Sequence, residues 1–143
     1  MGTPWNFATE YPSPNGKAKL VYGSVGEVAM SAPLAGDCFL IMDGEKFELN
    51  GLYGGPAIWS ENSARVAIPY WTKSRSQKLA IIDLQEMTIK ISEKDFRVIE
   101  LTKYKGGVVS GIDSPIYRSE NIAFQPEAEP YSQEIEIITG HKT

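Results

Sequence analysis

Three apolar runs of strand length follow one another within residues 54–84, and they constrain the fold more than any other stretch. Polar turn residues bound each run, and each is shorter than an ordinary helix: Ala57–Trp59, Arg65–Trp71 and Lys78–Leu84. Short apolar runs between turns are typical of strands that pair with their neighbours in the sequence. The stretch therefore predicts a three-stranded antiparallel meander.

The rest of the sequence also has patterns that are typical of strands and hairpins. Asp43-Gly44 stands between two alternating runs, Asp37–Met42 and Glu45–Leu49, and this dipeptide is a strong signal for a tight hairpin. No apolar pattern of period 3.6 continues over about 11 residues. At most a short helical turn is expected near residues 92–96, where Ser92 is a candidate N-cap. We therefore expect an all-β, mainly antiparallel fold.

A turn motif recurs along the sequence. Ser13-Pro14-Asn15-Gly16 and Ser60-Glu61-Asn62-Ser63 each precede an apolar strand, and Ser119-Glu120-Asn121 precedes Ile122–Phe124. The offset of roughly 40–50 residues matches the repeat length of β-propeller blades. The motif predicts repeated meander units.

The segment from Trp59 to Ile68, followed by Lys78–Leu84, resembles a β-propeller blade, with Asn62-Ser63 in place of the usual Asp-Gly. The resemblance implies one domain of two to three blade-like meander sheets. Its expected parts are an irregular lead-in, three units of which the last is partial, and a tail: 1–12, 13–55, 56–105, 106–139 and 140–143. A closed propeller needs at least about four blades, so an open half-propeller is expected. Its exposed edges would be covered by a partner, a second copy or the Pro-rich terminal segments.

Composition narrows the classes of function. The net charge is −4 and the pI about 5.0, which argues against general nucleic-acid binding. Cys38 is the only cysteine, so no internal disulfide is possible, and we expect a reducing, cytoplasmic location. No apolar stretch of about 20 residues occurs, so no membrane helix is expected.

Groups for catalysis or metal binding are sparse. His141 is the single histidine, near the end of the sequence, and no histidine lies close to Cys38 to activate it as a nucleophile. Asp83 is expected to accept hydrogen bonds within its own turn. We therefore predict no catalytic residue, no metal and no cofactor, while a pair of carboxylates acting as an enzyme stays open as an alternative.

Binding is the better-supported class of function. Trp71 alternates to the face opposite Tyr70, before a polar turn, so we expect it to be exposed and to anchor an interface. Acidic side chains gather after Arg118 with little compensating basic charge, and such clusters speed encounters with basic surfaces. The predicted partner-binding residues are Asp43, Glu45, Trp71, Glu120, Glu127 and Glu129.

In size, acidity, lack of catalytic groups and incomplete repeat, the chain resembles the small bacterial immunity proteins of contact-dependent growth inhibition and other polymorphic toxin systems. The resemblance implies a non-catalytic protein that covers the active site of a basic nuclease toxin in a 1:1 heterodimer. Carboxylates would mimic the phosphates of RNA, with no direct nucleic-acid or membrane binding. The alternatives are a small carboxylate-dependent enzyme and a self-associating β-scaffold module.

Overall fold

The computed structural model describes residues 2–27, 32–114, 116, 118–137 and 141–142, and all regular structure among them is antiparallel strand. The strands are β1 (Glu10–Pro12), β2 (Ala18–Glu27), β3 (Leu34–Met42), β4 (Glu45–Tyr53), β5 (Ile58–Trp59), β6 (Arg65–Trp71), β7 (Gln77–Asp83), β8 (Thr88–Ser92), β9 (Ile99–Lys105), β10 (Val108–Asp113), β11 (Glu120–Phe124), β12 (Tyr131–Glu136) and β13 (His141–Lys142). The predicted all-β class is confirmed. No helix long and apolar enough to cross a bilayer occurs among these residues.

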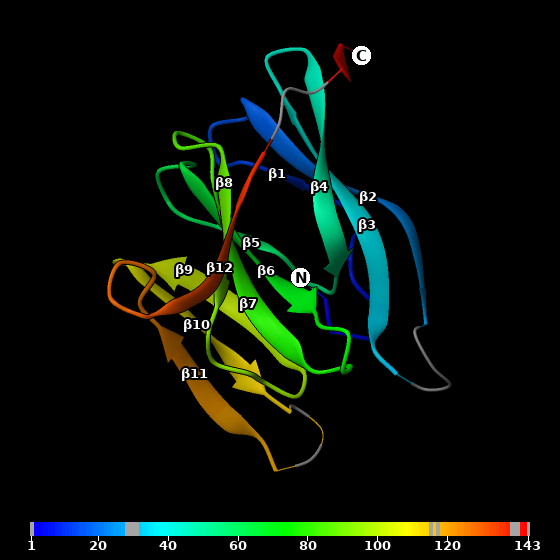
Figure 1. Cartoon of the computed structure of the whole chain (residues 1–143), viewed down its shortest axis with the longest axis vertical. Coiled ribbons are helices and arrows are strands. Elements are labelled where there is room, and N and C mark those ends of the chain that lie inside the picture. Colours follow the sequence, from blue (N-terminus) through cyan, green and yellow to red (C-terminus); the bar gives the residue numbers. More distant parts are fainter. Residues whose placement is uncertain (1, 28–31, 115, 117, 138–140, 143) are drawn as a thin grey trace.

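The strands form three meanders, which we call the first, middle and third sheets (Figure 1). The first sheet holds β1–β4, the middle sheet β5–β8 with β12, and the third sheet β9–β11. The first and middle sheets share hydrogen bonds where Leu52 and Tyr53 pair with Trp71 and Tyr70. Among the described strands, those of the two sheets therefore pair with each other only at the β4–β6 contact. Elsewhere the sheets are packed layers with an apolar cluster between them.

The middle sheet is buried on both faces. Its Val66, Ile68 and Ile82 pack in a cluster with the first sheet, while Leu79 and Ile81 pack in a second cluster with the third sheet. A strand covered on both sides reads as a nearly continuous apolar run. This double burial explains the apolar stretches that dominate residues 57–84.

Trp71 corrects the sequence-based expectation of an exposed anchor. Alternation does place it opposite Tyr70, but both faces of the middle sheet are covered, and Trp71 is only 7% exposed. Its indole Nε1–H donates to the carbonyl oxygen of Leu34 over 3.3 Å. Trp71 is a core residue that joins the middle sheet to β3. Trp59, expected in the core, is buried there.

Two of the three recurring turns have the same hydrogen-bond pattern. In each, a serine Oγ donates to an asparagine Oδ1 two residues later, at 2.7 Å for Ser13 and 2.8 Å for Ser60. Each serine Oγ also accepts the N–H of the residue five positions later, at 3.1 Å in both turns. Gly16 and Ser63 then occupy the same left-handed position, with φ of 73° and 63°. The first and middle sheets thus have the same turn before their second strands, β2 and β6.

The third turn does not repeat this pattern. Glu120 and Asn121 already belong to β11, and the third sheet is a plain meander in the order β11-β10-β9. The expected third unit at 106–139 is therefore divided: β10 and β11 belong to the third sheet, whereas β12 joins the middle sheet. The third sheet takes its remaining strand, β9, from the expected second unit.

Strands β12 and β13 cover one edge of the middle sheet and one edge of the first sheet. β12 pairs with β8, and β13 pairs with β4 near the top of Figure 1. Ile135 and Ile137 extend the cluster between the first and middle sheets. The strand expected at Glu134–Thr139 corresponds to β12, while positions 138 and 139, like 140 and 143 of the expected tail, lie outside the described residues.

The expected helical turn near 92–96 does not form. Ser92 ends β8, where its Oγ accepts the N–H of Leu79 and donates to the carbonyl oxygen of Lys94, both over 2.9 Å. The same serine therefore fixes a loop between strands and cannot cap a helix. The lead-in expected to be irregular likewise contains β1.

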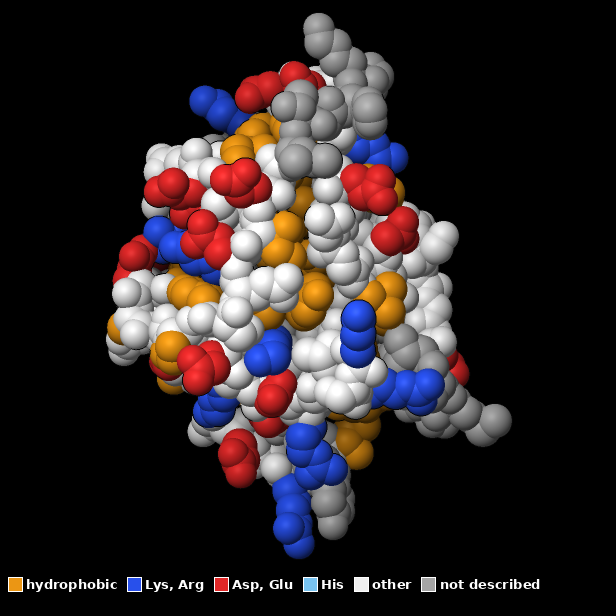
Figure 2. Space-filling model, in the orientation of Figure 1, with side chains coloured by type: hydrophobic (Ala, Val, Ile, Leu, Met, Phe, Trp, Pro, Cys, Tyr) orange, Lys and Arg blue, Asp and Glu red, His pale blue; other side chains and the backbone are white. Residues whose placement is uncertain are grey.

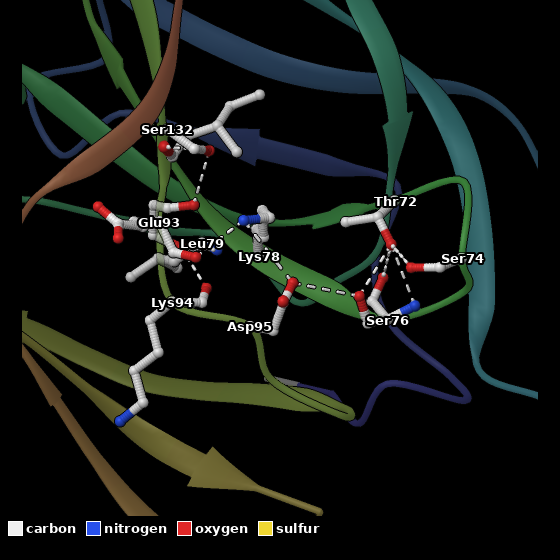
Figure 3. A network of polar contacts seen from close by, with 11 residues as sticks. Thr72, Ser74, Ser76, Lys78, Leu79, Glu93, Lys94, Asp95 and Ser132 are labelled. Atoms are coloured by element: carbon white, nitrogen blue, oxygen red, sulfur yellow. Dashed lines mark hydrogen bonds and ion pairs between the residues drawn. The ribbon is translucent and has the colours of Figure 1, made fainter.

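A polar network fixes this loop against the β6–β7 turn (Figure 3). Ser76 Oγ donates to Asp95 Oδ1 over 3.3 Å, and Lys78 Nζ lies 3.7 Å from the same oxygen. Lys78 also donates to the carbonyl oxygen of Glu93 over 2.8 Å, and Ser132 of β12 donates to that of Ser92 over 3.1 Å. This network fixes the end of the middle sheet at the β6–β7 turn. The cleft described below lies at the opposite end, next to Arg65 and Asp83.

Candidate functional site: an acidic cleft around Arg65

A cleft of about 380 Å³ opens between the middle and third sheets. Its walls come from the β5–β6 turn, the Arg65–Asp83 end of β6 and β7, the end of β9 with its Gly106-Gly107 turn, and the β11–β12 loop. The side chains that carry its chemistry are Glu61, Arg65, Asp83, Tyr104 and Glu127. The β6–β7 pairing places Asp83 beside Arg65, and the packing of the third sheet and the β11–β12 loop adds Tyr104 and Glu127.

Arg65 lies at the centre of the cleft. Its Nε is 3.1 Å from Asp83 Oδ2, and its Nη1 contacts Glu127 Oε1. Burial alone lowers the pKa of Arg65, but hydrogen bonds to Glu127, Tyr104 and Asp83 outweigh this and raise that pKa above its usual value. The guanidinium is therefore permanently charged, and three groups of the same cleft bind it.

Asp83 stands directly opposite Arg65 in the β6–β7 register. Its second oxygen, Oδ1, accepts the N–H groups of Gln85 at 2.9 Å and Glu86 at 3.0 Å, which confirms the predicted role in its own turn. Burial works to raise the pKa of Asp83, but these N–H groups and Arg65 lower it below 3.8. Asp83 is an ionised, fully engaged carboxylate, unsuited to act as a general acid.

Glu61 and Glu127 are less completely engaged. Glu61 Oε1 accepts the N–H of Gly106 over 3.2 Å, and Glu127 Oε1 meets Arg65, while the side chain of Glu127 is 72% exposed. Neither Oε2 has a partner among the residues that the structure describes. With Asp83, three carboxylates and one guanidinium line the cleft, which gives it a formal charge of −2.

Two tyrosines support the cleft. Tyr104 is 6% exposed, and burial raises its pKa, with Arg65 opposing that rise as its hydrogen-bond partner. Tyr131 donates its hydroxyl to the carbonyl oxygen of Pro126 over 2.6 Å, and burial raises its pKa to about 12. The Tyr131 bond anchors the loop that carries Glu127.

The structure separates the residues predicted to bind a partner. Glu127 and Glu129 lie in the β11–β12 loop, where only Glu127 lines the cleft, whereas Glu120 begins β11. Asp43 and Glu45 lie at the β3–β4 hairpin at the top of Figure 1, far from that loop at its left. The hairpin is the predicted tight turn, with positive φ at Asp43 and Gly44. Trp71 is buried, so the six do not form one surface.

Sequence reasoning missed Glu61, Arg65 and Tyr104. One local signal was present: Arg65 and Asp83 are charged residues at the outer ends of apolar runs, and strand pairing places such ends side by side. No comparable signal links either residue to Tyr104 or Glu127. Within the described ranges, no group of three His, Cys, Asp or Glu side chains is arranged to hold a metal ion.

Comparisons with models of protein families, with curated proteins and with solved structures find no match to this chain.

Proposed function

We propose that the protein is a non-catalytic immunity protein that binds a basic nuclease toxin in a 1:1 complex and covers its active site. The observation that carries this proposal is the acidic cleft, in which Glu61 and Glu127 each have one carboxylate oxygen unpartnered within the described chain. These oxygens are available to a cationic surface. The negative net charge of the cleft would attract such a surface.

The distribution of charge supports the same partner. Figure 2 shows most acidic side chains over the upper part of the drawn face and most basic ones toward the lower end, with both signs present in each part. Opposite charges at two ends orient a molecule as it approaches a charged partner and raise the association rate. A basic active site would therefore meet the acidic end first.

The fold supplies rigidity for such binding. Of the cleft carboxylates, Asp83 lies in a paired strand, while Glu61 and Glu127 are each oriented by one contact, with the Gly106 N–H and with Arg65, which reduces the side-chain entropy lost on association. A carboxylate held in place of an RNA phosphate would contact the same basic groups that bind the substrate. Inhibition would result from occupation of the substrate site, without any reaction.

The experiment first asks whether a basic protein co-purifies with this chain from its native cells at low salt, and then titrates the co-purified protein with the chain. We expect calorimetry to give 1:1 binding that weakens steeply as salt is raised, and a nuclease assay to show stoichiometric inhibition. Absence of a complex at low salt would overturn the proposal. Tight binding without inhibition would overturn the claim that the active site is covered.

A self-associating β-scaffold is the second candidate, because the outer edge of β11 pairs with no other strand of the described chain. Exposed strand edges are sites for pairing between molecules. Light scattering over a wide concentration range separates the two candidates. A monomer throughout contradicts the scaffold, whereas a dimer that forms without any toxin supports it.

A further inference from the structure

We propose that the Arg65 cleft takes one arginine side chain of the partner, with its guanidinium between Glu61 and Glu127. This inference rests on the proposed function only in assuming that the natural ligand is a basic protein. It assigns the point of engagement and the chemical group recognised there.

The arrangement of the two glutamates is the first argument. Glu61 comes from the β5–β6 turn and Glu127 from the β11–β12 loop, so they lie on separate elements lining one cavity. Each is fixed through its Oε1, by Gly106 N–H and by Arg65 respectively. Each Oε2 is then an acceptor on a side chain that one contact already orients before a ligand arrives.

The bonding of Arg65 is the second argument, because it determines whether the cleft favours a cation or an anion. Its Nε is engaged by Asp83, its Nη1 by Glu127, and it also bonds Tyr104. An anionic ligand would have to compete with these carboxylates for the guanidinium and would lie in a cleft lined by three of them. A cation meets a formal charge of −2 and need displace nothing.

The size and lining of the cleft favour guanidinium. A volume of about 380 Å³ is at the small end of the usual range for ligand pockets, so it suits a single long side chain. Guanidinium offers donors in a planar fork that can reach two carboxylates, whereas ammonium is a compact point charge. Tyr104 adds an aromatic residue to the lining, and aromatic rings attract guanidinium groups.

The test is an NMR titration with N-acetyl-arginine amide at low ionic strength, following the backbone amides of Gly106 and Gly107 in the cleft wall. The control ligand is N-acetyl-citrulline amide, which has nearly the same shape but no charge. We expect saturable shifts with the arginine compound and at least about tenfold weaker binding of the citrulline compound. Equal binding of the two, or no shift with either, would overturn the inference.

Variants locate the site. We expect Glu61→Gln combined with Glu127→Gln to weaken binding of the arginine compound by about tenfold or more. The matched control is Glu48→Gln, since Glu48 is an exposed glutamate of β4 that does not line the cleft. Thermal unfolding of each variant shows that the fold is intact. Similar affinities of the double variant and the control would overturn the inference.

The same variants separate this inference from the proposed function. If the toxin binds, and the double variant binds it as tightly as Glu48→Gln does, the function stands and the arginine site is wrong. If the cleft binds the arginine compound and no toxin complex forms, the site stands and the immunity function is wrong.

Discussion

The backbone N–H of Asn15 donates a hydrogen bond to Ser63 Oγ over 3.0 Å, and so joins the two copies of the repeated turn. Asn15 belongs to the turn before β2, and Ser63 to the equivalent turn before β6. The repeat therefore shapes the packing as well as each unit, because one copy of the motif supplies an acceptor for the other.

Substitution of Ser63 tests this contact. Ser63→Ala removes the acceptor and keeps a Cβ at a positive φ, so we expect a loss of about 1 kcal/mol in the free energy of unfolding. Ser63→Gly also removes the acceptor but relieves the backbone, as Gly16 does in the first copy, so its loss should be smaller. Urea unfolding measures both, with Ser119→Ala at an exposed position as the control. An alanine variant as stable as the control would contradict the role of the contact.

Gln77 joins the middle sheet to the third sheet and offers a second test. It is 1% exposed, and its Oε1 accepts the N–H of Ile99 over 2.6 Å. Gln77→Leu leaves that N–H buried without an acceptor, which we expect to cost about 1–3 kcal/mol in the free energy of unfolding. Gln133→Leu, at an exposed position of β12, should change it little. Equal effects in denaturant unfolding would show that the bond contributes nothing.

Asp83 predicts a pH dependence of stability. Its pKa in the folded protein lies below 3.8, the usual value expected in the unfolded chain. Its ionised form therefore stabilises the fold above about pH 3.8, and this stabilisation is lost as the pH falls through the lower folded pKa. Asp83→Asn should be less stable than the wild type near pH 7, and the difference should shrink in acid. Parallel stability curves from pH 7 down to 2 would contradict the assignment.

Ile137 tests the contribution of the C-terminal segment. It is 9% exposed and packs between the first and middle sheets, so we expect Ile137→Ala to cost about 2–4 kcal/mol in the free energy of unfolding. Ile116→Ala is the control, because Ile116 is 76% exposed and should lose almost nothing. Thermal or urea unfolding compares the two. A small effect at Ile137 would mean that the segment is only loosely packed.

Local signals predicted much of the sheet structure. The strand expected at Arg65–Trp71 matches β6, and the Asp43-Gly44 turn forms where expected. These features depend on neighbouring residues, on alternation and on the preference of certain residues for positive φ. The Ser/Asn turns belong to the same kind, and they are found in two of the three expected places.

Non-local packing accounts for the errors. Alternation correctly placed Trp71 on the side of β6 opposite Tyr70. That side is covered because β3 of the first sheet lies close to it, and the sequence does not show this contact. Ser92 has the right residue type for a helix cap, yet its hydroxyl is used by Leu79 in the adjacent strand. The cleft joins Arg65 to Tyr104 and Glu127 across three elements, and no periodicity in the sequence carries that information.

The pairing of β12 with β8 and of β13 with β4 has a consequence for synthesis on the ribosome. The edge of β8 can pair only after residues 131–136 have been made. The edge of β4 at Lys46 likewise can pair only after His141 has been made. A growing or stalled chain therefore presents an unpaired β8 edge beside a largely formed apolar sheet, a state prone to pair with other chains. Residues 131–136 and 141–142, translated after the other strands of both sheets, thus supply the strands that cover their edges.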